Sequence, residues 1–505
     1  MGPEIDGAKL VPLWKKHFWL NTASGAIRTV TRLILGLFLF RLLFSSLSTQ
    51  AFGFWSLLWS LFGYGILLDF GFGFTAQKAV AEKSATGDWQ DLSRLLSTLL
   101  WTFVGLSIIL ALFFFLIRGF FLSAVGLPDT AGTEYYLSYL IFFGGLALTF
   151  PFGLFPEVLQ GLQRLDLSNW LRTGAVVLNF IGIVVAIKLG ASFPVIVFVS
   201  VATTLLPLVG AMFVVFRMLP EVSLSIRNFD FRAIRSQLGF SMAAYLITFS
   251  NVLMAKSDQA VLGFTLGVGV ITYYQAGYKV SEMLNLFVVQ LQEALSPAAA
   301  NLNALGDNQG LRDLLLRTSR LTVLFVVPLY GLSAVYLEPL IKLLTGLDEV
   351  AHDVIMVGHI LLLAVFSSQL TNSCTKRILM MCGYEKKLLY VSLVEAGANF
   401  VISVCLALTI GMVGVAIGSL VPTVLVGWLW VLPMALKYTD LKLFAYVQYL
   451  FSESTPLILF AVCLGLTLFF LPMPEEGGFL NLCLRGSLSA GPAMAVILYR
   501  IKRVM

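Results

Sequence analysis

Long apolar runs, separated by short polar segments, follow one another along almost the entire chain. Each run has about the 20 residues that a helix needs to cross the hydrocarbon core of a bilayer. The pattern therefore predicts an all-α, polytopic membrane protein with about 14 transmembrane helices. We expect these helices at residues 18–46, 51–76, 95–118, 134–159, 168–189, 193–217, 238–265, 270–298, 318–341, 353–378, 388–410, 412–436, 446–471 and 479–500.

Composition agrees with a membrane location. Hydrophobic residues make up 58% of the 505 residues and charged residues only 12%, and the mean hydropathy is +0.90. A typical soluble domain has about 25% charged residues. The chain therefore has too few charged residues to cover a water-facing surface of ordinary size.

Basic residues are distributed unevenly between alternate loops. If the N-terminus is cytoplasmic, the inner segments contain 24 Lys and Arg residues and the outer segments only three, Arg118, Lys188 and Lys342. Cytoplasmic loops of membrane proteins carry this excess of positive charge. We therefore expect both termini in the cytoplasm. The net charge of +6 is attributed to this membrane face and not to nucleic-acid binding.

An internal repeat divides the chain. Residues 81–96 match residues 300–315 at an offset of 219, with Gly87 over Gly306 near the centre of the match. Both segments follow the second span of a half and both are expected on the cytoplasmic side. The two halves therefore enter the membrane from the same side, as in a parallel repeat.

A second match has nearly the same offset. Asn179 pairs with Asn399 at a separation of 220, and we expect both to make hydrogen bonds between helices. The repeat predicts two pseudo-symmetric six-helix lobes, residues 1–219 and 220–440, followed by two additional helices in residues 441–505.

Several motifs resemble those of a known family. They are Leu67-Leu-Asp69-Phe-Gly71-Phe-Gly73, the turn Leu159-Gln-Gly-Leu-Gln-Arg164-Leu-Asp166, and the stretches Lys256–Gly263, Tyr274–Lys279 and Leu295–Pro297. In this order they resemble the polysaccharide transport branch of the multidrug/oligosaccharidyl-lipid/polysaccharide (MOP) exporter superfamily, which includes the O-antigen flippases. The resemblance covers roughly residues 15–440.

The resemblance implies a two-lobed bundle that alternates between inward-open and outward-open states around a central cavity. The implied cargo is an undecaprenyl-diphosphate-linked oligosaccharide, which passes from the cytoplasmic to the outer leaflet of the bacterial inner membrane. This lipid-linked oligosaccharide supplies surface polysaccharide biosynthesis, for example of the O-antigen of lipopolysaccharide. The implied partners are this substrate, membrane lipids, and the polysaccharide polymerase and chain-length machinery.

Basic side chains within the predicted spans are the candidate cargo site. Arg28 and Arg32 are spaced i,i+4, so they share a helix face near the middle of the first span. Lys279 lies at a similar depth in the eighth span, and Lys256 lies in the outer part of the seventh. Fixed cations of this kind suit an anionic diphosphate, because Arg offers a planar fork of donors and Lys a point charge. Arg41, nearer the outer end, is expected to extend towards the interface.

Local ion pairs offer an alternative for the two lysines. Lys279 and Glu282 are spaced i,i+3, which allows a pair on one helix face. Lys256 and Asp258 are spaced i,i+2, which directs them apart on a helix. The sequence leaves open whether the lysines bind cargo or stabilise the fold.

Carboxylates within the spans are candidates for coupling or gating, since a buried acid can bind a proton or Na⁺. Of these carboxylates, we select Asp69, Asp258, Glu282 and Glu395 as the candidates. Asp69 lies near a cytoplasmic end, where a role in capping or at an inner gate is favoured. Glu395 has no local basic neighbour and is the better candidate for coupling.

The sequence gives little support for catalysis, nucleotide binding or a zinc site. No loop is long enough for a catalytic domain, the chain has no glycine loop that cradles phosphate, and His352 and His359 lack a clear third zinc ligand. We therefore expect a flippase without enzymatic activity, with no metal site and no cofactor other than a coupling ion. The alternatives are a cation-coupled multidrug exporter of the same superfamily and a membrane-embedded glycan polymerase or ligase.

Overall fold

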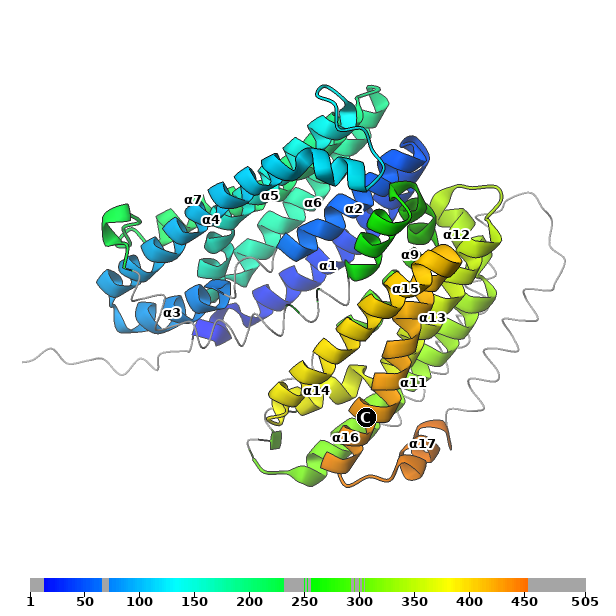
Figure 1. Ribbon diagram of the computed structural model, residues 1–505. Helices are drawn as coiled ribbons and strands as arrows, with labels where there is room; N and C mark the ends of the chain where they lie inside the picture. The colour runs from blue at the N-terminus through cyan, green and yellow to red at the C-terminus, as the bar shows by residue number, and fades with distance from the viewer. Residues whose placement is uncertain are drawn as a thin grey trace, which may run out of the picture. The chain divides into compact units, whose positions relative to one another are not determined.

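The computed structural model describes residues 13–65, 72–230, 256–291 and 305–452, together with 249, 252, 295, 299, 302 and 303. Every regular element within these residues is a helix (Figure 1). The predicted all-α fold is confirmed. The last predicted span and most of the one before it fall in residues 453–505, which lie outside the described residues, so the total of about 14 spans stays a prediction.

The described helices have the following bounds. They are α1 (Leu13–Ser46), α2 (Thr49–Gly65), α3 (Phe72–Thr86), α4 (Trp89–Ala124), α5 (Glu134–Gly161), α6 (Leu165–Lys188), α7 (Phe193–Met218), η2 (Ile226–Asn228), α9 (Val268–Leu291), α11 (Asn308–Val335), α12 (Leu337–Thr345), α13 (His352–Thr371), α14 (Ser373–Met381), α15 (Glu385–Val426), η3 (Gly427–Val431), α16 (Leu432–Tyr438) and α17 (Leu443–Ser452).

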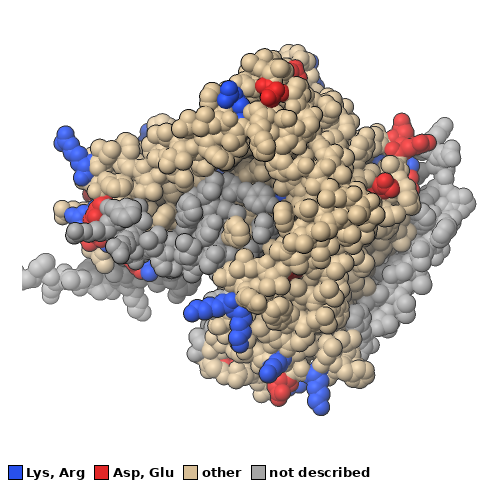
Figure 2. Space-filling model, viewed as in Figure 1, with Lys and Arg blue, Asp and Glu red and all other residues tan. Residues whose placement is uncertain are grey.

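The surface of these helices suits lipid. On the face shown in Figure 2, charged side chains lie mainly near the ends of helices, and wide areas between them are uncharged. On α4, for example, Ile108, Leu112 and Leu116 each expose more than half of their surface. Seven helices of the described residues are long and apolar enough to cross a membrane. The chain is therefore a multi-pass membrane protein.

A sharp bend separates two predicted spans. The long helical run of α15 contains non-helical backbone at Ile410 and at Gly411, whose φ is 65°. Glycine adopts this left-handed conformation without the steric cost that a Cβ would bring. The boundary predicted between residues 410 and 412 is confirmed.

Several helices continue beyond their predicted spans. The second span was expected to end at residue 76, but α3 reaches Thr86. The third was expected to begin at residue 95, but α4 begins at Trp89, where the side chain of Asp88 accepts a hydrogen bond from the Asp91 backbone N–H at 3.2 Å. Hydropathy locates only the apolar part of a helix, whereas capping fixes its true end.

The described chain falls into two compact units. Unit 1 comprises residues 1–47 and 61–249, and contains α1 and α3–α7. In it α5 packs against α3, α4 and α7, and α1 packs against α6. Side chains from α3, α4, α5 and α7, such as Leu99 and Leu154, form one continuous core.

Unit 2 comprises residues 48–60 and 250–505. In it α13 packs against α9, α11 and α15, and α17 packs against α11. The first part of α2 belongs to this unit. Thr272 Oγ1 donates to the Thr49 carbonyl at 2.7 Å. An added Cβ at Gly53 would lie 1.8 Å from the Val268 carbonyl oxygen, so this close approach requires glycine.

Packing thus divides the chain differently from the sequence repeat. The lobes predicted at residues 1–219, 220–440 and 441–505 follow sequence equivalence, whereas the compact units follow contacts. Those predicted domain bounds stay a prediction.

Turns recur along the two halves at the offset of the repeat. Four residues of unit 1 with positive φ have counterparts of positive φ in unit 2, each 219 to 221 residues later. The pairs are Gly87 and Gly306, Gly126 and Gly346, Gln163 and Gly383, and Gly190 and Gly411. The backbone therefore repeats its tightest turns even where the sequence match is weak.

Candidate functional site

The candidate cargo residues of unit 1 lie on α1. This helix is held against α6 by a buried hydrogen bond in which Asn169 Nδ2 donates to Ser24 Oγ at 3.1 Å. One turn further along α1, Arg28 is half-buried, and Arg32 is exposed. Both arginines therefore follow the contact between Ser24 and α6 along α1, and their depth in the membrane stays a prediction.

The exposed residues of α1 indicate the direction in which these two arginines point. Exposed apolar residues form a single stripe along α1, at Ile27, Val30, Ile34 and Phe38. With 3.6 residues per turn, Arg28 and Arg32 point roughly 135° around the helix from the middle of this stripe. The stripe is the face that suits acyl chains, so the two guanidinium groups are directed away from it.

The candidate lysines of unit 2 differ in their surroundings. Lys279 Nζ lies 2.8 Å from Glu282 Oε2, so the i,i+3 pair that the sequence left open is present. The backbone carbonyl of Lys256 accepts a hydrogen bond from Ser60 Oγ at 3.2 Å. Binding of cargo by either lysine stays a prediction.

Asp258 is the centre of a cluster of oxygen atoms within unit 2. Tyr274 on α9 donates its hydroxyl to Asp258 Oδ2 at 2.5 Å. Ser419, in the second half of α15, lies 2.9 Å from one carboxylate oxygen and 3.0 Å from the other. The carboxylate thus joins α9 and α15.

Asn399 extends this cluster. Its amide nitrogen donates to Ser419 Oγ at 2.9 Å, and its oxygen accepts from Ser257 Oγ at 2.9 Å. We refer to Ser257, Asp258, Tyr274, Asn399 and Ser419 as the Asp258 cluster. The interhelical hydrogen bonds expected of Asn399 are confirmed, as are those of Asn179, which donates to Thr203 Oγ1 at 2.8 Å.

A second buried carboxylate has a basic partner. Glu395 on α15 is fully buried, and its Oε2 lies 2.9 Å from Lys376 Nζ on α14. Among the described residues its other oxygen, Oε1, has no hydrogen-bond partner. The sequence showed no local base for Glu395 because the lysine precedes it by 19 residues, on the other side of a turn.

One candidate is not located. Asp69 lies in residues 66–71, outside the described residues, so its proposed role in gating stays a prediction.

The Asp258 cluster has the chemistry of a site for a hard cation or a proton. Carboxylate and hydroxyl oxygens converge on Asp258, and these are ligands that hard cations prefer. Sequence reasoning identified Asp258 and Asn399 but missed Ser257, Tyr274 and Ser419. The missing signal is tertiary, because Ser419 and Asp258 are 161 residues apart.

Comparison with protein families gives one match. The family model described as polysaccharide biosynthesis protein matches residues 14–302. No curated protein matches the chain.

Solved structures share the fold at low sequence identity. The inward closed conformation of the lipid II flippase MurJ is 14% identical, with a TM-score of 0.69, and the match covers 94% of this chain and 99% of that one. An inward-facing multidrug resistance MATE family transporter of the MOP superfamily is 14% identical, with a TM-score of 0.64, over 82% and 96% of the two chains. A MOP superfamily transporter from Pyrococcus furiosus, described as having a binding pocket of reverse polarity, is 14% identical, with a TM-score of 0.55, over 85% and 96%. The MOP fold predicted by resemblance is confirmed.

Proposed function

The chain belongs to the polysaccharide biosynthesis protein family, and on that premise we propose that it is a flippase for a lipid-linked oligosaccharide. It moves an undecaprenyl-diphosphate-linked glycan from the cytoplasmic to the outer leaflet of the bacterial inner membrane by alternating access. The product serves surface polysaccharide biosynthesis, such as O-antigen assembly.

The direction of Arg28 and Arg32 is the observation that carries this proposal. A basic side chain at the centre of the bilayer costs about 2.5–3.5 kcal/mol on insertion scales and normally faces a cavity or a partner. The two guanidinium groups point away from the apolar stripe of α1, at a spacing of one helical turn. Two adjacent guanidinium groups offer the donors and the charge that a diphosphate needs when it leaves water.

We assign the diphosphate mainly to these arginines. Lys279 already faces Glu282 at 2.8 Å, so part of its charge is neutralised within unit 2. Lys279 and Lys256 are therefore proposed as secondary contributors.

Replacing both arginines tests the cargo site. In a strain that lacks the chromosomal copy, we expect Arg28→Ala/Arg32→Ala to abolish surface glycan export while protein levels stay normal. Arg41→Ala is the matched control, because Arg41 lies on the same helix but nearer the predicted outer end, and this variant should export normally. Full export by the double variant would remove the arginines from the site.

The same strains separate this function from its main alternative. If the protein were a cation-coupled multidrug exporter, its deletion would increase drug susceptibility and leave the surface glycan intact. That result would overturn the proposal.

We propose further that the Asp258 cluster couples transport to Na⁺ or H⁺, with Glu282 and Glu395 as additional candidates. The cluster supplies a carboxylate, two serine hydroxyls, a phenol and an amide to one place on unit 2. Measuring glycan transport in proteoliposomes with imposed Na⁺ and H⁺ gradients would identify the ion. Transport that is indifferent to both gradients would contradict this assignment.

A further inference from the structure

A polar cavity of about 340 Å³ opens beside the first turns of α4 in unit 1. Its lining includes Trp89, Gln90 and Arg94 from α4, and Glu221 and Asn228 from the segment that follows α7. The proposed topology places this cavity on the cytoplasmic side. We propose that it binds neutral sugar residues of the glycan before translocation. This inference rests on the proposed function and adds a second, headgroup-independent contact with the cargo.

One wall of the cavity belongs to residues 219–230, which we call the strap. Hydroxyl groups of α4 fasten its backbone. Ser97 Oγ donates to the Ser223 carbonyl at 3.0 Å and accepts from the Ser225 N–H at 3.1 Å. Ser93 Oγ accepts from the Ser223 N–H at 3.1 Å. The strap therefore has a fixed position along α4.

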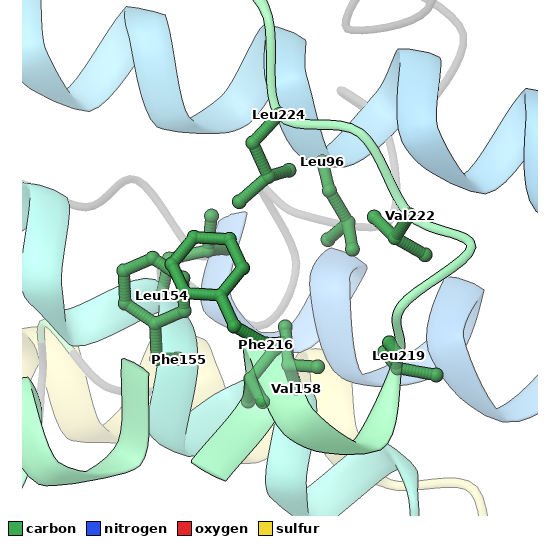
Figure 3. Close-up of a pocket in the computed structure, with 9 residues that line it drawn as sticks. Leu96, Leu154, Phe155, Val158, Phe216, Leu219, Val222 and Leu224 are labelled. Carbon is green, nitrogen blue, oxygen red and sulfur yellow. The ribbon is translucent and has the colours of Figure 1, made fainter. Parts of the chain in front are cut away.

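Apolar side chains also hold the strap. Figure 3 shows Val222 and Leu224 of the strap around one small apolar pocket, which Leu96 of α4 and Phe155 of α5 also line. Val222 is buried in the same core that holds α4 and α5. Because hydrogen bonds and apolar packing both fix the strap, the two walls of the polar cavity are pre-organised relative to each other, as a binding site requires.

The lining suits a sugar ring. A pyranose has apolar C–H faces and a rim of hydroxyls that both donate and accept. Trp89 is partly buried and packs against the core of unit 1, so its ring is held as a flat surface against which a C–H face can lie. Gln90 and Asn228 each offer a donor and an acceptor, whereas Arg94 only donates and Glu221 only accepts. The volume is in the usual range for ligand sites, about 300–1,000 Å³.

Charge argues against a phosphate at this place. The N-terminus of α4, which would attract an anion, already has Asp88 as its cap and Asp91 in its first turn. Asp91 also lies 4.0 Å from Arg94, and Glu221 adds a further carboxylate to the lining. These carboxylates would repel a diphosphate, whereas a neutral sugar carries no charge for them to repel.

Binding by the purified full-length protein tests the proposal. The probes are neutral trisaccharides of hexoses, N-acetylhexosamines and 6-deoxyhexoses, and inorganic pyrophosphate is the anionic comparison. Binding of each probe to the protein in nanodiscs is measured by titration calorimetry. We expect at least one trisaccharide to bind saturably, and Trp89→Ala to weaken that binding at least tenfold. Trp170→Ala is the matched control, because Trp170 is 52% exposed on α6, and it should leave binding unchanged.

A second variant guards against misfolding. Gln90 is exposed in the first turn of α4, so Gln90→Leu should fold normally and weaken the same trisaccharide at least threefold. Arg28→Ala/Arg32→Ala should retain trisaccharide binding, so failure of the arginine test and failure of this test are distinguishable. No saturable binding of any trisaccharide would overturn the proposal, and so would binding that survives both Trp89→Ala and Gln90→Leu, or binding of pyrophosphate alone.

Discussion

In unit 1, Asn179 of α6 donates to Ser200 Oγ at 3.3 Å and to Thr203 Oγ1 at 2.8 Å on α7. In unit 2, its repeat counterpart Asn399 donates to Ser419 Oγ at 2.9 Å, across the bend of α15. The same amide fastens the same pair of consecutive helices in both units. This part of the duplicated architecture has been kept.

What surrounds the two asparagines differs. In unit 2 the hydroxyl of Ser419 also contacts Asp258. In unit 1 the repeat offset of 219 to 220 places the apolar residues Leu39 and Phe38 at the position of Asp258. Glu395 likewise has the buried Ala175 as its counterpart.

The candidate basic residues Arg28 and Arg32, in contrast, are present in unit 1 and absent from the corresponding positions of the second half. Arg28 and Arg32 belong to unit 1, and the repeat offset places only uncharged residues at their counterparts, 247–248 and 251–252. The two halves therefore share a scaffold but differ in the charged residues that they carry at these positions. Cargo-binding cations are proposed for one half and ion-binding carboxylates for the other.

Of the three changes that compare the units, removing the Asp258 charge should have the largest effect. Asp258→Asn keeps the shape of the side chain but removes the charge that a proton or Na⁺ requires. We expect glycan export to fall at least tenfold and the ion dependence of transport in proteoliposomes to disappear. Leu39→Asn, which introduces the same side chain at the unit 1 counterpart, is the comparison for a mere packing defect. Normal export by Asp258→Asn would reduce the cluster to a structural role.

Breaking the Lys376–Glu395 pair should have a large effect on stability. Lys376→Met leaves a buried carboxylate without its partner, which costs about 3 kcal/mol or more. The double variant Lys376→Met/Glu395→Leu replaces both charges and should recover to within about 1 kcal/mol of the parent. Denaturation in mixed micelles gives both values. Equal losses in the single and double variants would show that the pair is not coupled.

The asparagines themselves should give the smallest effect. Interhelical hydrogen bonds in membranes contribute about 0.6 kcal/mol on average, so Asn179→Ala and Asn399→Ala should destabilise the protein by similar small amounts. Glycan export should distinguish the two variants, because Asn399 is a member of the Asp258 cluster and Asn179 is not. If Asn179→Ala reduced export as strongly as Asn399→Ala, the proposed specialisation of unit 2 would be wrong.

Local spacing predicted much of what the structure contains. The apolar runs located the helices, the break between residues 410 and 412 is present at Gly411, and the i,i+3 spacing of Lys279 and Glu282 yields an ion pair. These features depend on residues close together in the chain, where helical geometry fixes the neighbours.

Features that depend on distant residues were not predictable. Lys376 reaches Glu395 across the turn between α14 and α15, and Tyr274 and Ser419 reach Asp258 from two other helical segments. The sequence also did not predict the short helix α12 as a separate element. Its apolar residues continue those of α11, so the hydropathy pattern has no break at Tyr336. Periodicity describes one helix at a time, so it does not report which faces meet.

Fastening the strap to α4 has a mechanical consequence. The Asp230 N–H bonds to Thr98 Oγ1 at 3.0 Å, so the chain stays attached to α4 as far as residue 230, well beyond the end of α7 at Met218. A force on the chain at residue 230 would therefore enter unit 1 through the flank of α4. Ser93→Ala/Ser97→Ala would leave this last attachment in place, because Thr98 and the buried Val222 would still hold the strap.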